Sequence, residues 1–269
     1  MGNINALVIS VSSASERRAM QMRQLEKLDL SGDIMDAVTP DDVPISELDG
    51  YRFSWARPLS NGEIACALSH RKAWQYAVNS KEPILVLEDD VILSDDVAEV
   101  LKSLADGPDL GYVTLEFYGQ SKDLGHPTPL QSTQYGLSRL YRDRGGAAAY
   151  VIWPKTAKRI LDLQKQSLPL ADAAINLSLG IKFYQLEPAC AVQSNVLARE
   201  YSSIEDNPVT KAVANNTRPE YPSKLIYVKC KMRRLYCSGI LFVKVIQSLG
   251  RSSKRFIKHT VTPRIIEES

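Results

Sequence analysis

The sequence is poor in the residues that bind structural metals or cross-link small domains. Only four cysteines and three histidines occur among 269 residues, and no pair of cysteines has CxxC spacing. This pattern predicts neither a structural zinc site nor a disulfide framework. The opening residues lack the basic and apolar regions of a secretory signal, and Ala6 breaks the myristoylation motif. We therefore expect a reduced, cytoplasmic protein.

The sequence also lacks an apolar run long enough to cross a membrane. The most apolar late stretch, Leu235 to Leu249, contains Lys244. It falls short of the about 20 apolar residues that a spanning helix needs. Such a stretch is compatible with lying on a membrane surface.

The sequence has almost no excess of charge of either sign, but its basic and acidic residues are unevenly distributed along the chain. Thirty-three Lys and Arg against 31 Asp and Glu give a net charge of +2, so nothing global favours nucleic-acid binding. Residues 221–269 hold eleven Lys and Arg and two Glu, which leaves 22 basic and 29 acidic residues in 1–220. The chain therefore divides into an acidic body, 1–220, and a basic tail, 221–269.

Alternating apolar patterns predict an α/β fold. The β-branched run Ala6–Val11 predicts a strand, and Ser13 and Glu16 have the spacing of a capping box for the helix that follows. Ser60 and Glu63 repeat that spacing before a second helix, which Pro83 ends. Further strands are expected at 33–38, 84–87, 110–115, 147–153 and 181–186, and further helices from 94, over 154–164 and in the tail.

Residues 117–145 and 188–222 show no clear period and are expected to be irregular connections. Strands that alternate with helices favour a mostly parallel sheet flanked by helices, with the tail packed outside it.

Three acids follow the buried strand at 84–87. Because strand residues alternate faces, Glu88 and Asp90 should share a side while Asp89 points away. Like charges this close disfavour joint ionisation, and a divalent cation would compensate them. Carboxylate oxygens select Mg²⁺ or Mn²⁺, and ligands of open α/β sheets bind beyond the carboxyl ends of the strands. The alternative is a solvated strand-to-helix turn.

Other candidates are weaker. Arg17 and Arg18 open the first helix, where backbone N–H groups favour a phosphate, although exposed helix arginines are the alternative. Ser69 and His70 are neighbours on a helix and point about 100° apart, so we reject a nucleophilic dyad. Cys66 has no sequence companion for catalysis and is expected to be a core residue.

Two long motifs carry a family resemblance. Leu59–His70 with Trp74, and then Ile84–Val91, resemble glycosyltransferase family 25, which includes bacterial lipooligosaccharide galactosyltransferases. Val8–Ser10 with Glu16–Arg18 resembles the family's opening, and Gly146–Ile152 resembles a later strand. The resemblance covers about residues 4–195.

The resemblance implies a GT-A-like fold, a UDP-sugar donor, most often UDP-galactose, and inverting transfer to a sugar hydroxyl. Carried over to this sequence, it assigns Glu88 and Asp90 to a Mn²⁺ or Mg²⁺ ion and the donor diphosphate. It assigns the following residues to donor binding: Ser10, Arg17, Arg18, Glu63, Ser69, His70 and Asp89.

Inverting transfer needs a base to accept the acceptor hydroxyl proton. Asp172 matches an acid of the family in a loosely matching segment and is the first candidate, with a helix N-cap as its alternative. Glu116, at the end of a predicted strand, is the reserve candidate, with a solvated strand end as its alternative. Tyr118, Tyr135 and Tyr141 are candidates for stacking on acceptor sugars, against ordinary local packing.

The predicted catalytic domain is thus 1–220, acting on a lipooligosaccharide or lipopolysaccharide acceptor. The tail, 221–269, is expected to hold it at the anionic inner face of a bacterial cytoplasmic membrane, since each Lys or Arg there contributes roughly 1 kcal/mol. A metal-dependent phosphohydrolase and a non-catalytic sugar-binding or membrane-scaffold protein are the alternative functions.

Overall fold

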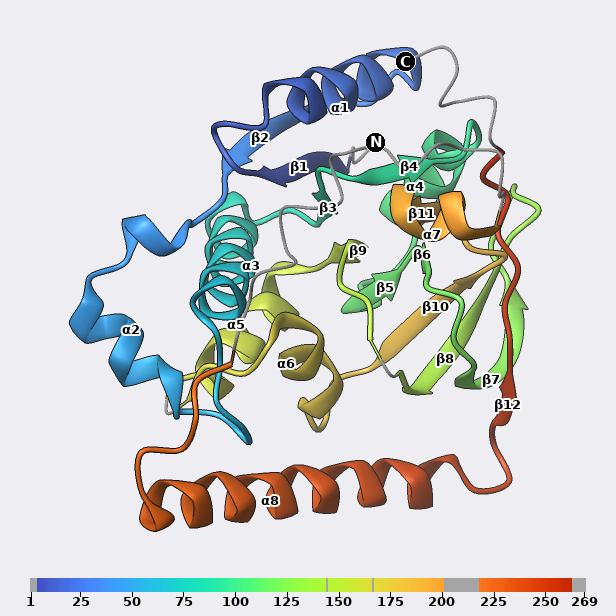
Figure 1. Cartoon of the computed structure of the whole chain (residues 1–269). Helices are drawn as coiled ribbons and strands as arrows, with labels where there is room; N and C mark the ends of the chain where they lie inside the picture. The colour runs from blue at the N-terminus through green and yellow to red at the C-terminus, as the bar shows by residue number, and fades with distance from the viewer. Residues whose placement is uncertain (1–3, 144, 166, 201–217, 263–269) are drawn as a thin grey trace.

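The computed structural model describes residues 4–143, 145–165, 167–200 and 218–262 (Figure 1). Within these ranges the strands form a nine-stranded sheet of order β12-β7-β8-β10-β5-β9-β3-β1-β2 and a three-stranded sheet of order β4-β11-β6. Contrary to the prediction from the sequence, the stretch 188–222 is not irregular throughout, because 191–193 form a strand and 194–200 a helix. Residues 201–217 of that stretch, and Arg264 of the tail, lie outside the described residues.

The strands of the large sheet are β1 (Asn5–Ser10), β2 (Gly32–Asp36), β3 (Ile84–Glu88), β5 (Tyr112–Thr114), β7 (Lys122–Pro129), β8 (Gly136–Arg142), β9 (Ala149–Ile152), β10 (Phe183–Glu187) and β12 (Ser253–Arg255). The small sheet comprises β4 (Val91–Leu93), β6 (Glu116–Phe117) and β11 (Ala191–Gln193). The helices are α1 (Ser15–Lys27), the 3-10 turn η1 (Pro40–Asp42), α2 (Ile45–Arg52), α3 (Asn61–Ser80), α4 (Val97–Asp106), α5 (Pro154–Leu163), α6 (Ala171–Leu177), α7 (Ser194–Glu200) and α8 (Lys224–Ser248).

The large sheet is mixed. Parallel pairing holds for β2, β1 and β3 and for β5 with β10, whereas β9 lies between β3 and β5 and is antiparallel to both. The expectation of a mostly parallel sheet therefore holds for β3, β1 and β2 and for the β5–β10 pair, and is wrong for the other neighbouring pairs of the sheet. The antiparallel β9 enters from the carboxyl end of β3, where the backbone N–H of Glu88 donates to the carbonyl of Ala148 at 2.8 Å.

Strand β3 is buried on both faces, as its continuous apolar run predicts. Leu85 and Leu87 pack in the cluster that also contains side chains of α1 and α4. Ile84 and Val86 face the opposite cluster, which contains Trp74 of α3. Each such buried side chain contributes roughly 1.5–3 kcal/mol, so the end of β3 is a firmly held position.

Helix α3 begins at the predicted capping box. Ser60 Oγ accepts from the backbone N–H of Glu63 at 3.2 Å, and Glu63 Oε2 accepts from the N–H of Ser60 at 3.0 Å. The corresponding prediction for α1 is wrong, because its N-cap is Ala14, which has no side-chain cap. The first helix still begins within two residues of the predicted place.

Residues 117–145 are not the irregular connection that the sequence predicts. They contain the last residue of β6 and the β7–β8 hairpin, whose register shifts between Asp123 and Leu124 and again before Pro127. Lys122 is buried at the start of β7 and pairs with Asp143 at 2.8 Å. This ion pair stabilises β7, which the sequence does not predict because the strand contains Gly125, Pro127 and Pro129.

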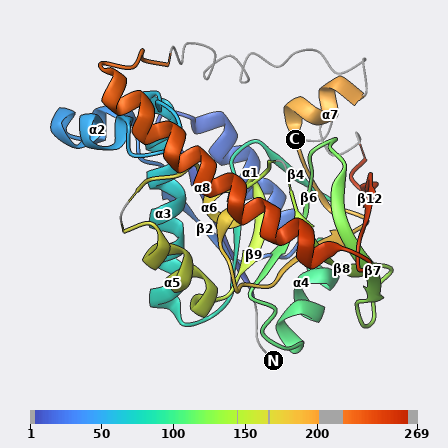
Figure 2. The same ribbon diagram turned by 90° about the horizontal axis from the view of Figure 1, so that it is seen from below.

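The basic tail forms α8 and then β12. Helix α8 lies across the body as the element nearest the viewer in Figure 2, and β12 extends the large sheet by pairing Ser253 with Leu124 of β7. The prediction of a helix packed outside the sheet is confirmed for Lys224–Ser248. Among the helices that the structure describes, we find none with the length and apolarity needed for a membrane span.

Candidate functional site

The acidic triplet lies at the carboxyl end of β3, which ends at Glu88. Glu88 and Asp90 turn toward the same point: Gln193 Nε2 lies 3.2 Å from Glu88 Oε2 and 3.3 Å from each carboxylate oxygen of Asp90. Gln193 ends β11, whose backbone pairs with β4 just beyond the triplet. The two carboxylates therefore share a side, as strand alternation predicts.

Asp89 faces a different set of partners. Ser10 Oγ, at the end of β1, donates to Asp89 Oδ2 at 2.5 Å, and Arg17 Nη1 lies 3.0 Å from Asp89 Oδ1. Burial raises the pKa of Asp89, and the contacts with Ser10 and Arg17 oppose that rise. The structure thus brings three of the predicted donor-binding residues into one cluster at the amino end of α1.

Two buried glutamines of α1 fix the backbone that follows the triplet. Gln21 Nε2 donates to the carbonyl of Val91 at 2.7 Å and to that of Asp89 at 3.2 Å. Gln24 Oε1 accepts from the N–H of Leu93 at 2.9 Å. Since buried polar groups are costly unless paired, these bonds hold the turn in one conformation.

The charges of the site favour a cation. Burial raises the pKa of Asp90 to about 6, and the neighbouring Glu88 adds to the rise. Hard carboxylate oxygens that converge on one point suit Mg²⁺ or Mn²⁺. The carboxylates of Glu88 and Asp90 therefore have the chemistry and the placement that a divalent cation requires of its ligands.

A buried hydrogen-bond chain reaches Glu88 from α3 and β9. Trp74 Nε1 donates to Tyr150 Oη at 2.8 Å, Tyr150 Oη lies 3.0 Å from His70 Nδ1, and His70 Nε2 lies 3.2 Å from Glu88 Oε1. Burial disfavours the charged imidazole, but the contacts with Tyr150 and Glu88 outweigh it and raise the pKa of His70 well above its ordinary value. His70 therefore presents a proton to Glu88 and positions that carboxylate.

Cys66 is not the core residue that the sequence predicts. Its side chain is exposed, one helical turn before His70. Ligand atoms of Cys66, His70 and Glu88 lie within 4.8 Å of one another. The thiol is thus a neighbour of the acidic site. The sequence gives no sign of this, because no charged residue is adjacent to Cys66 in the chain.

Three further predicted donor-binding residues have other contacts. Ser69 is buried, with its hydroxyl donating to the carbonyl of Ala65 and accepting from the N–H of Val38 at 2.8 Å. Arg18 donates to the carbonyl of Ser10 at 2.8 Å and pairs with Asp36. The contact of Ser69 with Val38 and those of Arg18 with Ser10 and Asp36 join neighbouring parts of the fold.

Glu63 forms a two-bond pair with Arg57, at 2.8 Å for each bond, besides capping α3. Burial opposes the effect, but hydrogen bonds from Arg57 and from the N–H of Ser60 lower the pKa of Glu63 to about 2. Both oxygens of this carboxylate are thus engaged in holding the start of α3 to Arg57.

Asp172 lies in the first turn of α6 and is partly exposed. Its Oδ1 accepts from the N–H of Ala173 at 2.7 Å, and a Cβ built on Gly145 would lie 3.9 Å from its Oδ2. Burial raises the pKa of Asp172, while the nearby charge of His70 opposes the rise. Asp172 is therefore within electrostatic range of the acidic site, and its Oδ2 accepts no hydrogen bond from the residues that the structure describes.

Glu116 is fully enclosed. Its Oε2 accepts from the N–H of Ala148 at 3.0 Å and crowds Gly146, where an added Cβ would lie 2.7 Å from that oxygen. Burial raises the pKa of Glu116 to about 8, against the opposing charge of Lys122. A carboxyl that is protonated at neutral pH and screened from solvent is a poor base, so Glu116 acts as a support for the segment before β9.

The three tyrosines considered for stacking on acceptor sugars lie in different environments. Tyr118 is 39% exposed, and its ring lies 3.5 Å from a Cβ built on Gly145, beside Asp172. Tyr135 is 3% exposed and donates to Asp96 at 2.6 Å, so local packing, and not stacking on a sugar, describes it. Tyr141 lies beneath the guanidinium of Arg139. Only Tyr118 of the three is near the candidate base.

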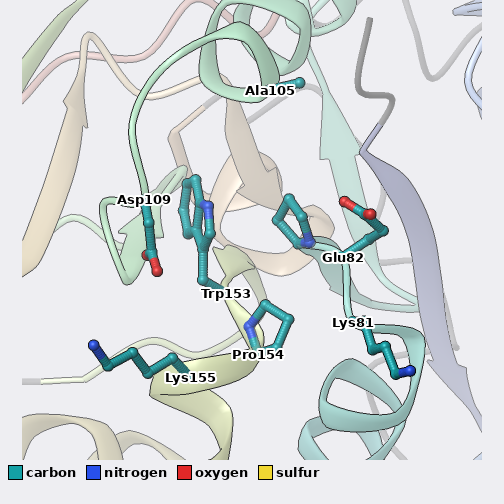
Figure 3. Close-up of a pocket in the computed structure, with 8 residues that line it drawn as sticks. Lys81, Glu82, Ala105, Asp109, Trp153, Pro154 and Lys155 are labelled. Carbon is teal, nitrogen blue, oxygen red and sulfur yellow. The ribbon is translucent and has the colours of Figure 1, made fainter.

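A cavity of about 400 Å³ lies at the opposite end of β3 (Figure 3). Lys81 and Pro83, which precede the strand, and Trp153, which follows β9, contribute to its walls. The acidic triplet is at the other end of the same strand, so this cavity is separate from the candidate site.

Comparisons with known proteins assign the chain to a family. Residues 3–175 match the family model described as glycosyltransferase family 25 (LPS biosynthesis protein). The chain belongs to glycosyltransferase family 25. The matched residues include the triplet, its Ser10 and Arg17 partners, the α3 motif and Asp172.

Individual relatives of this family member extend the comparison. A Haemophilus influenzae protein, provisionally described as a glycosyltransferase, is 30% identical over 209 residues, covering 71% of this chain and 70% of the relative. The lipooligosaccharide biosynthesis protein lex-1 of the same organism is 26% identical over 235 residues, or 72% and 77% of the two chains. Human procollagen galactosyltransferase 2 is 31% identical over 119 residues, 40% of this chain and 19% of that protein.

Proposed function

We propose that this family 25 glycosyltransferase transfers a hexose, with galactose the first candidate, from a UDP-sugar to a saccharide hydroxyl of a lipooligosaccharide or lipopolysaccharide acceptor, with inversion. The observation that carries the proposal is the convergence of Glu88 and Asp90 at the end of the buried β3, with Asp89 fixed by Ser10 and Arg17. The site lies where a GT-A-like sheet would bind a nucleotide.

Glu88 and Asp90 would hold a Mn²⁺ or Mg²⁺ ion. When bound, such an ion neutralises the charge that develops on the departing nucleoside diphosphate. His70 orients Glu88 through the 3.2 Å contact, and the Trp74–Tyr150 chain orients His70. Arg17 adds a positive charge on the donor side.

Asp172 is the proposed base. Its raised pKa, and an Oδ2 that accepts no hydrogen bond within the described part of the chain, suit it to accept the proton of an acceptor hydroxyl. Tyr118, beside it, offers an apolar face to the acceptor sugar. The inverted product requires attack from the face opposite the diphosphate, and the anomeric carbon passes through an oxocarbenium-like state.

A screen of UDP-sugars tests the proposal. We expect UDP release that needs Mn²⁺ or Mg²⁺ and rises when a lipooligosaccharide acceptor is added. Release that is indifferent to acceptor would favour a phosphohydrolase, and saturable donor binding without any transfer would favour a non-catalytic protein. With an acceptor of this kind, the enzyme would act at the inner face of the bacterial cytoplasmic membrane.

A further inference from the structure

Helix α8 carries an apolar stripe on its exposed side. The stripe consists of Leu225, Val228, Met232, Leu235, Phe242 and Ile246, whose side chains are 51–66% exposed. The residues follow alternating steps of three and four, with Gly239 at the missing step. At 3.6 residues per turn these positions occupy an arc of about 100°, which is the width of an amphipathic helix face.

The opposite side of α8 packs on the body. Cys230, Ile240 and Lys244 are buried, and Lys244 Nζ lies 4.9 Å from the ring centre of Phe183. Arg233 Nη1 donates to the carbonyl of Phe53 at 2.9 Å. The helix is thus docked by one face, and Figure 2 shows it lying along the outside of the body. The exposed stripe is a second apolar face, beyond what packing of the helix requires.

Basic side chains border the stripe. Lys224, Lys231 and Arg234 lie along one edge and Lys229 along the other, and all four are exposed. The sequence contains no Asp or Glu from Tyr221 to Ile266. An apolar face with cations on both edges is the pattern of a helix that lies in the interface of an anionic bilayer.

A second copy of the chain is the competing occupant, because steps of three and four also form coiled coils. In such a pair the bordering lysines Lys224, Lys229 and Lys231 would face one another, and like charges at those positions oppose association. Gly239 would also leave the centre of the seam without a side chain. Charge therefore favours lipid over self-association.

We infer that α8 is a docking surface for an anionic phospholipid bilayer. The stripe enters the boundary between headgroups and acyl chains, and the bordering Lys and Arg contact lipid phosphates. The helix lies parallel to the membrane and leaves its buried face on the body. The inference rests on α8 alone and holds whether or not the proposed sugar transfer is correct.

Sedimentation with vesicles tests the inference on the full chain. We expect binding to vesicles of equal parts phosphatidylcholine and phosphatidylglycerol, little binding to phosphatidylcholine alone, and weaker binding in about 1 M NaCl, where the Debye length is about 3 Å. Leu235→Ser with Phe242→Ser should lower the partition coefficient by about tenfold or more. Ile45→Ser with Leu163→Ser, equally exposed apolar positions on α2 and α5, should leave it unchanged.

The charges and the stripe can be tested separately. Gln at Lys229, Lys231 and Arg234 should lower binding by about tenfold or more, whereas Gln at Lys102, Lys155 and Lys158, exposed on α4 and α5, should not. Gly239→Leu completes the stripe in open space and should strengthen binding several-fold. Gly50→Leu, at an equally open site on α2, should not. A misfolded variant cannot mimic this gain.

Equal binding by the stripe variant and its control overturns the inference, as does a Gly239→Leu variant that binds no better than Gly50→Leu. Light scattering tests self-association. If the natural chain is a dimer that binds no vesicles, and Leu235→Ser with Phe242→Ser dissociates it, the stripe is a self-association surface and the inference is overturned. Sugar transfer to a soluble acceptor is measured in parallel, so failure of docking and failure of the proposed function are distinguishable.

Discussion

Gln193 lies between Glu88 and Asp90, with its amide nitrogen 3.2 Å from the first carboxylate and 3.3 Å from both oxygens of the second. A neutral amide satisfies hydrogen bonds but adds no positive charge between the two carboxylates. Burial and the neighbouring Glu88 therefore make the charged form of Asp90 unfavourable, and this cost has consequences that can be measured.

Removing one charge should stabilise the protein when no cation is present. In excess chelator, Asp90→Asn should raise the melting temperature, because it relieves the repulsion and burial that raise the pKa of Asp90 to about 6. A gain of about 1 kcal/mol corresponds to about 2–4 °C in a protein of this size class. Thermal unfolding measures it, with Asp95→Asn, exposed nearby, as control. A lower melting temperature for Asp90→Asn contradicts the account.

Asp172→Asn should lower the rate of sugar transfer by about 10²–10⁴-fold, since it removes a general base. Donor binding should change little, because Asp172 lies on the Tyr118 side of the site. Glu116→Gln serves as the comparison and should retain transfer within about tenfold. Steady-state rates at saturating donor measure both, and near-normal turnover by Asp172→Asn removes it as the base.

Arg17 and Arg18 should differ despite being neighbours. Arg17→Gln should raise the KM for donor about tenfold or more, because it removes a cation that pairs with Asp89 beside the proposed nucleotide site. Arg18→Gln should instead lower the melting temperature, because Arg18 joins the end of β1 to Asp36 of β2. Donor titrations and thermal unfolding of both variants separate the effects; equal changes in KM would show that the two residues are not functionally distinct.

Glu116 should make stability depend on pH. Its pKa is about 8 in the folded chain against 4.5 for the ordinary value, so the folded state keeps a proton that the unfolded state loses. The resulting stability is fully present below about pH 4.5 and is lost as the pH rises through about 8. Glu116→Gln keeps an acceptor for the N–H of Ala148 without this loss. Urea unfolding at several pH values across that range should show the free energy of unfolding of the variant rising relative to that of the natural chain as the pH rises. A difference between the two that does not change with pH would contradict the raised pKa of Glu116.

The sequence predicts this fold best where the determinants are local. The Ser60–Glu63 capping box and the apolar run 84–87 act within one turn or one strand, and the structure contains both as expected. The β7–β8 hairpin depends instead on contacts between distant residues. Lys122 pairs with Asp143 and donates to Gln185 at 2.6 Å, and no local sequence pattern predicts either contact.

The same division holds for the site. Strand alternation predicts that Glu88 and Asp90 share a side, and they do, although β3 ends at Glu88 and Asp90 lies in the turn that follows. Gln193 lies more than one hundred residues later, at the end of a three-residue strand, and carries no motif that could have indicated it. Glu116 looked like an exposed strand end because its burial depends on the close approach of Gly146.

The most direct test of the account is calorimetric titration of UDP into the full chain, with Mn²⁺ and with excess chelator. We predict that UDP binds with Mn²⁺ present and that binding weakens about tenfold or more in chelator and in both Glu88→Gln and Asp90→Asn. Asp95→Asn should bind as the natural chain does. Unchanged affinity in Glu88→Gln and Asp90→Asn would contradict the claim that these carboxylates hold the cation and the donor diphosphate.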